Sequence, residues 1–298
     1  LLGFIKFCKE DISKFNPDKI IFIDNSGFNL RIAKWAKTNN FYTIYYISPQ
    51  VWASRSGRVK DIKRDIDEMY VILPFVEDFY KKHDYKVTFV GHPLLDAIAN
   101  RKQARESEFR KEYNLGEKPI IALLPGSRKQ EITKLLAVML KMADKFTDYQ
   151  FVIAGAPSQD YQFYQQFISK ENVKFISDRT YDLLSLSYAA IVTSGTATLE
   201  TALFKVPEIV CYKTSWLSYQ IGKRLINLKY ISLVNLIMDK EVVQELIQND
   251  FNEKTLEYEL HKILDEDIRT KMFLNYFELE KKLGGKGASI KVAKLIVG

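Results

Sequence analysis

The sequence is poor in the residues that build disulfide scaffolds and metal centres. Its 298 residues include two cysteines, Cys8 and Cys211, and three histidines. Two cysteines cannot form a disulfide framework or a four-cysteine zinc site, and each lies beside apolar residues, which favours buried free thiols. No two histidines have the H-x-x-x-H spacing of a helical metal site. We therefore expect neither a metal ion nor a cofactor in this protein.

Long apolar runs and a strong charge excess are missing as well. No stretch reaches the ~18 apolar residues that cross a bilayer. The first residues include Lys6, Lys9, Glu10 and Asp11, which is typical of an amphipathic helix and not of a signal peptide. The net charge of +7 comes from 44 basic and 37 acidic residues, too dispersed for a nucleic-acid-binding stripe. We expect a cytoplasmic protein and, since the first residue is Leu1, a chain that begins partway through a natural protein.

The chain instead alternates short apolar runs with segments of helical periodicity. Continuous apolar runs of this length are typical of buried parallel strands. We expect strands at residues 19–24, 41–47, 68–73, 86–90, 119–124, 149–155, 173–177, 189–194 and 208–213. The pattern predicts an α/β protein with two doubly wound domains, residues 1–105 and 106–298. From about residue 214 we expect helices only, as a C-terminal tail of the second domain.

The segment LLPGSRKQEI (123–132) follows a predicted strand with a small-residue turn and a helix that begins near Lys129. In a parallel sheet this places free backbone N–H groups and a helix N-terminus where ligands bind. Gly126, Ser127 and Arg128 are therefore candidates for binding a phosphate, Arg128 through its planar guanidinium. The alternative is an ordinary strand-to-helix turn with a surface arginine. The segment fits neither a Walker loop nor G-x-G-x-x-G.

The segment SGTATLE (194–200) has the same arrangement at the end of another predicted strand. Gly195 allows a close approach of the backbone to an anion, and Ser194 and Thr196 supply hydroxyl groups. Glu200 follows one turn into the helix, where its carboxylate could accept hydrogen bonds from two ribose hydroxyls. The alternative is a helix N-cap followed by a first-turn glutamate that complements the helix dipole.

Two further strand ends have groups that could move a proton. Asp24 in IDNSGFN (23–29) could deprotonate a hydroxyl, and His92 in VGHPLLD (90–96) could be a general base or a hydrogen-bond donor. As alternatives, Asp24 could cap a helix that begins near Phe28, and His92 could make a structural hydrogen bond at a domain hinge.

Two more segments are candidates for contact with a large ligand. The loop SPQVWASRSGRVK (48–60) combines Trp52 with Arg55 and Arg58, which suits a membrane surface or an acidic lipid headgroup. A packed tryptophan beside a solvated helix start explains that loop equally well. The segment SLVNLIMDKEVVQELIQ predicts a loop and then a helix, whose polar groups could bind a base or a sugar or could simply face solvent. Its candidate residues are Asn235 in the loop, and Gln244 and Glu245 on the helix.

Taken together, these motifs resemble the lipid-A-disaccharide synthase family, which are glycosyltransferases with two Rossmann-like domains, the GT-B fold. The resemblance runs from about residue 17 to 250, in order, through FNLRIAKWAK, YYISPQVWASRSGRVKDIKRDID, LPFVEDFY, TFVGHPLLD, IALLPGSRKQEI, SGTATLETAL and YISLVNLIMDKEVVQELIQ. It implies transfer of 2,3-diacylglucosamine from its UDP derivative to 2,3-diacylglucosamine 1-phosphate (lipid X), which gives lipid A disaccharide 1-phosphate and UDP. It also implies inversion at the anomeric carbon without a metal, by a peripheral protein on the inner membrane.

The resemblance also implies roles for the candidate residues. The diphosphate would contact the turn at 126–128 and the turn at 194–196, and Glu200 would bind the ribose. Arg128 and the fixed N–H dipoles would stabilise the charge on the leaving UDP, while Asp24 or His92 would take the acceptor's proton. The uridine and glucosamine ends would contact Asn235, Gln244 and Glu245. Members often dimerise by exchanging C-terminal parts, so the helical tail is a candidate exchange element.

Two departures from the family pattern keep other interpretations open. The family normally begins with a G-E-x-S-G-D turn, which this sequence lacks, and it often reads I-D-x-P-D-F-N where this chain has Gly27 in place of the second aspartate. These departures favour a non-catalytic remnant that binds a UDP-sugar or a lipid. Another GT-B enzyme, such as a UDP-sugar epimerase or a peptidoglycan glucosaminyltransferase, is the other alternative, which the S-P-x-V-W-A and GHPLLD segments disfavour.

Overall fold

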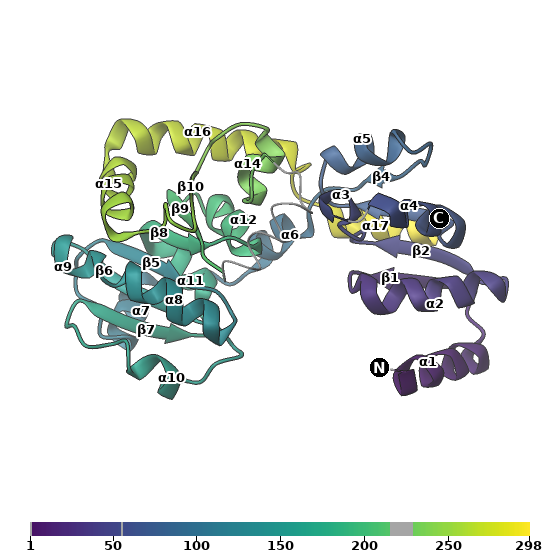
Figure 1. Cartoon of the computed structure of the whole chain (residues 1–298), viewed down its shortest axis with the longest axis horizontal. Coiled ribbons are helices and arrows are strands. Elements are labelled where there is room, and N and C mark those ends of the chain that lie inside the picture. Colours follow the sequence, from purple (N-terminus) through teal and green to yellow (C-terminus); the bar gives the residue numbers. More distant parts are fainter. Residues whose placement is uncertain (1, 55, 215–228) are drawn as a thin grey trace. The chain divides into compact units, whose positions relative to one another are not determined.

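The chain forms two compact units, each built on its own parallel sheet (Figure 1). The computed structural model describes three stretches of the chain, residues 2–54, 56–214 and 229–298. Within these stretches, the first unit contains residues 2–99 and 282–298, and the second contains residues 100–214 and 229–281. The prediction of an α/β protein with two doubly wound domains is therefore confirmed.

A four-stranded parallel sheet in the order β1-β2-β3-β4 forms the centre of the first unit. Its strands are β1 Lys19–Ile23, β2 Tyr42–Tyr46, β3 Glu68–Val71 and β4 Thr88–Phe89. The helices of this unit are α1 Leu2–Phe15, α2 Ser26–Thr38, α3 Val51–Ser54, α4 Val59–Asp65, α5 Phe75–Lys81, α6 Pro93–Asn100 and α17 Ala288–Val297, with a 3₁₀ turn at Ser56–Arg58. Each strand joins the next through a helical connection, which is what a parallel sheet requires.

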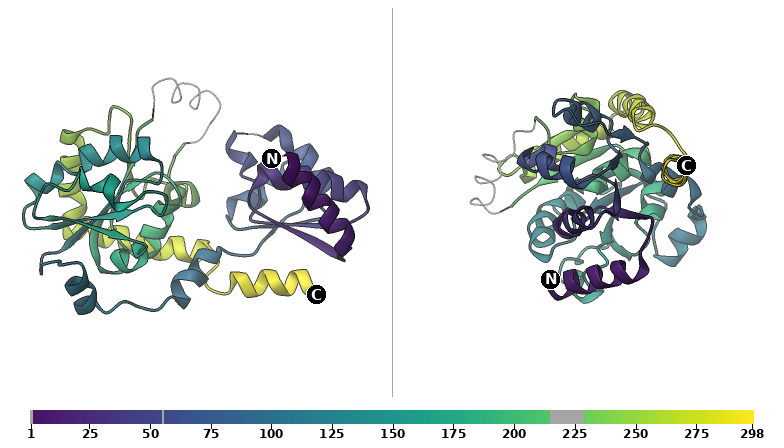
Figure 2. Two further views of the ribbon diagram at one scale, coloured as in Figure 1. Left: turned by 90° about the horizontal axis from the view of Figure 1, so that it is seen from below. Right: turned by 90° about the vertical axis from the view of Figure 1, so that its right-hand side faces the viewer.

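The last helix of the chain, α17, packs on the first unit (Figures 1 and 2). Val292 is buried in an apolar cluster that includes Tyr70 of β3. The carboxylate of Asp96 accepts hydrogen bonds from the backbone N–H groups of Gly287, at 2.6 Å, and Ser289, at 2.8 Å, and so caps the start of this helix. This division of the chain differs from the two predicted domains, residues 1–105 and 106–298. The spacing of apolar residues predicts a helix but does not show which sheet the helix covers.

A six-stranded parallel sheet in the order β10-β9-β8-β5-β6-β7 forms the centre of the second unit. Its strands are β5 Ile120–Leu124, β6 Gln150–Gly155, β7 Val173–Ser177, β8 Ser187–Thr193, β9 Glu208–Tyr212 and β10 Gln244–Ile247. Its helices are α7 Glu106–Glu112, α8 Lys129–Met139, α9 Met142–Lys145, α10 Tyr161–Gln165, α11 Thr180–Leu186, α12 Thr196–Leu203, α14 Leu233–Met238, α15 Glu253–Leu264 and α16 Glu266–Lys282. Every residue of the central strand β5 is buried, as expected of a sheet covered on both faces.

One predicted element is wrong. The segment with Gln244 and Glu245 is not a helix but the edge strand β10, which pairs in parallel with β9. Its apolar residues Val243 and Leu246 are buried. An edge position on β9 satisfies the backbone groups of a four-residue segment, which is too short to be a stable helix by itself. The predicted loop at Asn235 is likewise helical, as part of α14.

The start of β9 contains a buried acid. Glu208 is wholly buried, and neither of its carboxylate oxygens has a hydrogen-bond partner among the described residues. Burial raises the pKa of this carboxyl well above its ordinary value of 4.5, because the apolar surroundings disfavour the charged form. The folded protein therefore binds this proton more tightly than the unfolded chain does.

Replacing Glu208 with methionine should raise the free energy of unfolding by about 1–3 kcal/mol at pH 8, since the change removes a buried polar group without a partner. Because the folded-state pKa lies above the unfolded one, the stability of the native protein falls as the pH rises above 4.5 toward the folded-state pKa. Urea unfolding at pH 5 and pH 8 measures this, and the advantage of methionine should widen at pH 8. Glu208→Gln is the control, since its stability should not follow this pH dependence. A methionine variant less stable at both pH values would contradict the argument.

Candidate functional site

A cavity of about 380 Å³ opens at the carboxyl ends of the strands in the second unit. After adding β6 and β7 on one side of β5, the chain returns to place β8 on the other side. Ligands of open parallel sheets bind at such a reversal of strand order, and we call this space the switch-point cavity. It is lined by Leu124, Gly126, Ser127, Glu131, residues 154–157, Thr180, residues 193–197 and Glu200.

Two helices begin at this cavity without a capping side chain. The N-cap residue of α8 is Arg128 and that of α12 is Gly195, and neither makes a side-chain cap hydrogen bond. In the same unit, α10, α14 and α15 are capped by the side chains of Asp160, Ser232 and Asn252, whereas the N-cap residues of α7, α9 and α11 also make no such bond. The first N–H groups of α8 and α12 are thus left for another acceptor, and an anion is the acceptor that a helix N-terminus favours.

The turn between β5 and α8 has a shape that only glycine permits at its centre. Gly126 has a φ of +101°, and a Cβ atom there would collide with the carboxylate of Glu131. The carbonyl of Ser127 accepts a hydrogen bond from the Ser158 hydroxyl at 2.8 Å, which fixes the turn further. On its other side Glu131 lies 3.4 Å from the hydroxyl of Thr193. Glu131 therefore lies between the two turns that the sequence motifs indicated. The sequence feature that could have identified it is an acidic residue in the first turn of α8.

Glu200 lines this cavity, and one of its two carboxylate oxygens is hydrogen-bonded within the protein. The hydroxyl of Tyr181 donates a hydrogen bond of 2.8 Å to Oε1 of Glu200. Burial and this bond raise the pKa of Tyr181, so the phenol remains a donor. No first-turn acid is present in α12, where Glu200 is the fifth residue, so the dipole alternative is wrong. The second oxygen, Oε2, is the part of Glu200 that could accept hydrogen bonds from a ligand.

Arg128 lines a second, adjacent cavity instead of the switch-point cavity. The side chain is exposed, and it has no ion pair with any residue that the structure describes. An exposed arginine without partners changes rotamer on the picosecond to nanosecond scale. The guanidinium is therefore free to approach an anion bound at the start of α8.

Asn235 is a hub of hydrogen bonds and has no exposed surface. Its amide donates to the carbonyl of Val243, at 2.8 Å, and to Oε1 of Glu245, at 2.9 Å. Its carbonyl oxygen accepts from the backbone N–H groups of Val242 and Val243, at 2.7 and 3.0 Å. The side chain therefore connects α14 to the segment that leads into β10.

Glu245 fixes the segment that precedes α14. Its carboxylate accepts from the N–H groups of Ile231 and Ser232, each at 2.9 Å. The carbonyl of Ile231 in turn accepts a hydrogen bond of 3.1 Å from the Ser194 hydroxyl, at the wall of the cavity. The side chain of Gln244 makes no hydrogen bond to the described residues and is half-buried. Of the three candidates in this segment, Glu245 and Asn235 thus connect to the cavity through Ser194.

Asp24 lies in the first unit, at the carboxyl end of β1. The backbone bends sharply here, since Asp24 and Asn25 both have a left-handed φ. The amide of Asn29 donates to the carbonyls of Ile23 and Asp24, which secures the bend. Asn25, and not Asp24, is the N-cap residue of α2, so the capping alternative is wrong and the Asp24 carboxylate is exposed.

His92 lies in the turn between β4 and α6, also in the first unit. Its Nδ1 atom accepts a hydrogen bond from the backbone N–H of Leu94 at 3.2 Å, and the backbone N–H of His92 donates to the carbonyl of Leu283 at 3.0 Å. Burial lowers the pKa of His92 to about 4. The imidazole is therefore neutral near pH 7, and its ring proton is on Nε2.

The candidate membrane loop is partly packed. Trp52 is half-buried and meets Phe75 edge to face, with ring centroids 4.8 Å apart. Arg58 is also half-buried, as the N-cap residue of α4 without a side-chain cap bond. Arg55 lies outside the described residues. The packing of Trp52 agrees with the structural alternative for this residue.

Neither a metal cluster nor a spanning helix is seen in the part of the chain that the structure describes. No three His, Cys, Asp or Glu side chains there lie close enough to share a metal ion. In the same residues, no helix has both the length and the apolar character that crossing a bilayer requires. Both cysteines are free, Cys211 buried and Cys8 half-buried.

Comparison with known proteins gives one family over almost the whole chain. A family model described as lipid-A-disaccharide synthetase matches residues 1–291. Lipid-A-disaccharide synthase of Syntrophus aciditrophicus (strain SB) is 42% identical over 294 residues, which cover 96% of this chain and 76% of that protein. The synthase of Coxiella burnetii (strain CbuG_Q212) is 38% identical over 294 residues, with 97% of this chain and 77% of that protein covered.

Solved structures share the fold at low identity. UDP-GlcNAc 2-epimerase from Neisseria meningitidis, bound to UDP-GlcNAc, gives a TM-score of 0.69 at 12% identity and covers 99% of this chain and 80% of its own. The S. aureus MnaA–UDP co-structure gives 0.68 at 14% identity, with coverages of 98% and 78%. The glycosyltransferase of kitacinnamycin gives 0.64 at 11% identity, with coverages of 99% and 79%. These likenesses show the GT-B fold that the sequence motifs predicted.

Proposed function

The chain belongs to the lipid-A-disaccharide synthase family, and from that premise we propose which of its residues bind and activate the substrates. It is a hexosyltransferase of lipid A biosynthesis, which transfers 2,3-diacylglucosamine from its UDP derivative to 2,3-diacylglucosamine 1-phosphate and releases UDP. The observation that supports our assignment most is the pair of uncapped helices, α8 and α12, which begin at one cavity.

We propose that the switch-point cavity binds the UDP part of the donor. The turn at Gly126 and Ser127 and the turn at residues 194–196 would contact the diphosphate through backbone N–H groups and hydroxyls. As the bond from the sugar to the diphosphate breaks, negative charge develops on the leaving UDP. Fixed N–H dipoles and the Arg128 guanidinium would stabilise that charge more in the transition state than in the ground state.

Titration of the chain with UDP in a calorimeter, without added metal, tests this assignment. UDP should bind and ADP should bind much more weakly, since the site would select the pyrimidine. Turnover of the two lipid substrates is then the second measurement. Equal affinity for UDP and ADP, or no binding of either, would contradict a UDP site in this cavity.

We propose that Glu200 binds the ribose, since Tyr181 occupies only one of its two carboxylate oxygens. Glu200→Ala should then weaken UDP binding by roughly 1–3 kcal/mol, because ribose hydroxyls lose a charged acceptor. Calorimetric titration of UDP measures this. Tyr181→Phe is the matched control: it removes the Tyr181–Glu200 bond and leaves the carboxylate, so UDP affinity should change little. Equal affinity in the alanine variant and the native chain would assign Glu200 to packing alone.

For the acceptor's proton we propose Asp24 as the base, with His92 in a different role. The Asp24 carboxylate is exposed and makes no side-chain hydrogen bond to any described residue. His92 is a weak base, because its pKa lies near 4 and its Nδ1 already accepts a hydrogen bond. Its Nε2–H group could instead donate to the acceptor.

Asn235, Gln244 and Glu245 remain candidates for the uridine and glucosamine ends of the donor. We propose that Asn235 and Glu245 act as positioning residues, since their polar atoms bond to the chain itself. Through Ile231 they fix the partner of the Ser194 hydroxyl at the cavity wall. Gln244, which has no such bonds among the described residues, is the one of the three left for direct contact.

We also propose that the protein acts at the inner face of the cytoplasmic membrane, where its lipid substrates reside, and that the loop with Trp52, Arg55 and Arg58 faces the lipid. A homodimer that exchanges C-terminal parts is a further proposal. Support comes from the segment before α17, where Gly284, Gly285 and Gly287 all have a left-handed φ. Such a glycine-rich connection can adopt a second path at low cost.

A further inference from the structure

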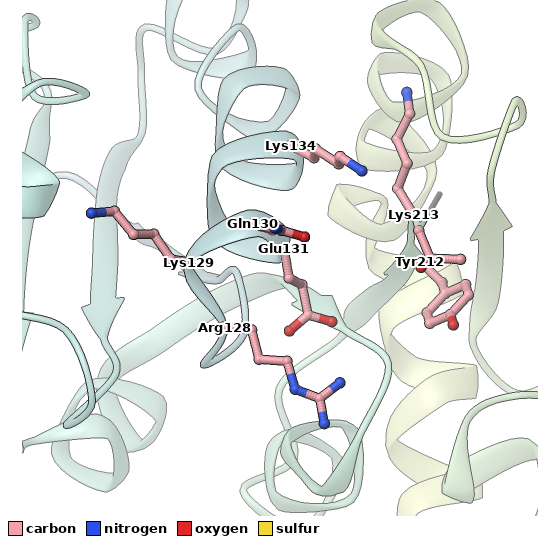
Figure 3. Close-up of a pocket in the computed structure, with 8 residues that line it drawn as sticks. Arg128, Lys129, Gln130, Glu131, Lys134, Tyr212 and Lys213 are labelled. Atoms are coloured by element: carbon pink, nitrogen blue, oxygen red, sulfur yellow. The ribbon is translucent and has the colours of Figure 1, made fainter. Parts of the chain in front are cut away.

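A second cavity, of about 370 Å³, adjoins the switch-point cavity and shares Glu131 with it. We call it the lysine cavity. It is lined by Arg128, Lys129, Gln130, Glu131, Lys134, Tyr212, Lys213 and Thr214. Figure 3 shows Lys134, from α8, and Lys213, just after β9, directed toward the same space, whereas Lys129 points away from it.

The cations of this cavity have no carboxylate partner. Lys134 and Lys213 make no ion pair with any described residue, and the residues outside the described part include no Asp or Glu. The ammonium of Lys213 lies over the ring of Phe251, 5.9 Å from its centroid. Glu131, the single acid of the lining, lies against Gly126 and Thr193 instead.

Nearby lysines show that this arrangement is not general on this face. On α9, Lys145 pairs with Glu253 at 3.1 Å and with Glu257 at 2.6 Å, and the preceding Lys141 pairs with Glu253 at 2.9 Å. Two ammonium groups that face one space without a counter-charge repel each other, and an anion between them removes that repulsion. The lysine cavity therefore has the charge of an anion site.

The chemistry of the lining favours a phosphate monoester on a polar body. Lysine binds phosphate oxygens as a point charge, and two lysines match the two charges of a monoester. Beside them, the Tyr212 hydroxyl and the Glu131 carboxylate can exchange hydrogen bonds with sugar hydroxyls. Of the two substrates, the donor has a diphosphate, for which the neighbouring cavity is the proposed site. The acceptor has the remaining phosphate.

We propose that the lysine cavity binds the 1-phosphate of the acceptor, with Lys134 and Lys213 as its ligands. The proposal rests on the proposed function for the identity of the acceptor. It places the two phosphate groups of the reaction on opposite sides of Glu131, which lines both cavities. Because the Glu131 side chain lies between the two sites, each phosphate needs its own cationic or N–H partners.

The test measures binding of glucosamine 1-phosphate to the full chain by calorimetry, with UDP present at saturation. Binding should be weakened at least about tenfold in the Lys134→Ala/Lys213→Ala double variant. The Lys134→Gln/Lys213→Gln variant, which keeps polar side chains but removes both charges, should lose as much. Lys111→Ala is the charge-matched control. Lys111 lies on α7 and lines neither cavity, so this variant should bind like the native chain. UDP affinity should be the same in all variants.

Further probes separate the sources of the phosphate. Glucosamine and inorganic phosphate should each bind at least about tenfold more weakly than glucosamine 1-phosphate. Equal binding of inorganic phosphate would overturn the assignment to the acceptor. Binding to phosphatidylglycerol vesicles that matches binding of the sugar phosphate, and that both double variants lose, would overturn it as well. Native-like binding of glucosamine 1-phosphate in both double variants would overturn the site itself. If UDP fails to bind while the lysine dependence remains, the donor assignment fails and the anion site stands.

Discussion

Arg128→Ala is expected to lower kcat/KM by about 100-fold to 1000-fold, the effect of removing one donor that stabilises developing charge. The side chain begins at the N-cap of α8, has no ion pair among the described residues, and is exposed. The charge that it would meet grows as UDP leaves, so we expect the loss mainly in kcat. UDP affinity should also fall, because the product has the full diphosphate charge.

Steady-state kinetics with both lipid substrates, together with UDP calorimetry, measure this loss. Lys129→Ala is the matched control, since it removes the neighbouring positive charge, which points away from the cavity toward Phe163 (Figure 3). That variant should stay close to native turnover. Arg128→Lys should recover part of the activity, because an ammonium keeps the charge but loses the planar pair of donors. Native turnover and native UDP affinity in Arg128→Ala would remove Arg128 from the site.

Most of the fold could be predicted because the strands of a parallel sheet are continuous apolar runs. The central strands β5 and β8 are such runs: β5 begins one residue later than predicted, and β8 begins two residues earlier and ends one residue earlier. β10 could not be predicted in this way. In VVQELI, the apolar residues fall at spacings of one, three and four, which suit a helix as well as an edge strand. Pairing with β9 decides between them.

The candidate site was predictable only in part, because sequence shows strand ends but not side-chain directions. The turns at Gly126 and Gly195 follow strands, and the sheet brings them to one cavity. The sequence did not single out Lys134 and Lys213, since their placement at one cavity depends on how α8 lies beside the end of β9. Asn235 looked like a ligand-binding amide, yet its environment is the interior of the protein.

Asn235→Leu is expected to lower the free energy of unfolding by about 3–5 kcal/mol. Leucine has the same branched arrangement of side-chain heavy atoms, although it is larger, and it has no polar atoms. The N–H groups of Val242 and Val243, the carbonyl of Val243 and one oxygen of Glu245 would therefore lose a partner. Each buried polar group without a partner costs about 1–3 kcal/mol, and partial relaxation of the surrounding chain reduces the sum.

Urea unfolding compares this variant with Gln244→Ala, the matched control on the same segment. Gln244 is half-buried and makes no side-chain hydrogen bond to the described residues, so its loss should change stability by less than about 0.5 kcal/mol. UDP titration at a temperature where Asn235→Leu is still folded separates the two roles of the amide. If Asn235 is a positioning residue, the substitution should mainly lower the free energy of unfolding and should change UDP affinity only through Ser194. If Asn235 contacts the uridine directly, UDP affinity should fall while the free energy of unfolding stays native. That second outcome would require the buried amide to leave its four hydrogen bonds for the ligand, and would overturn its assignment as a structural hub.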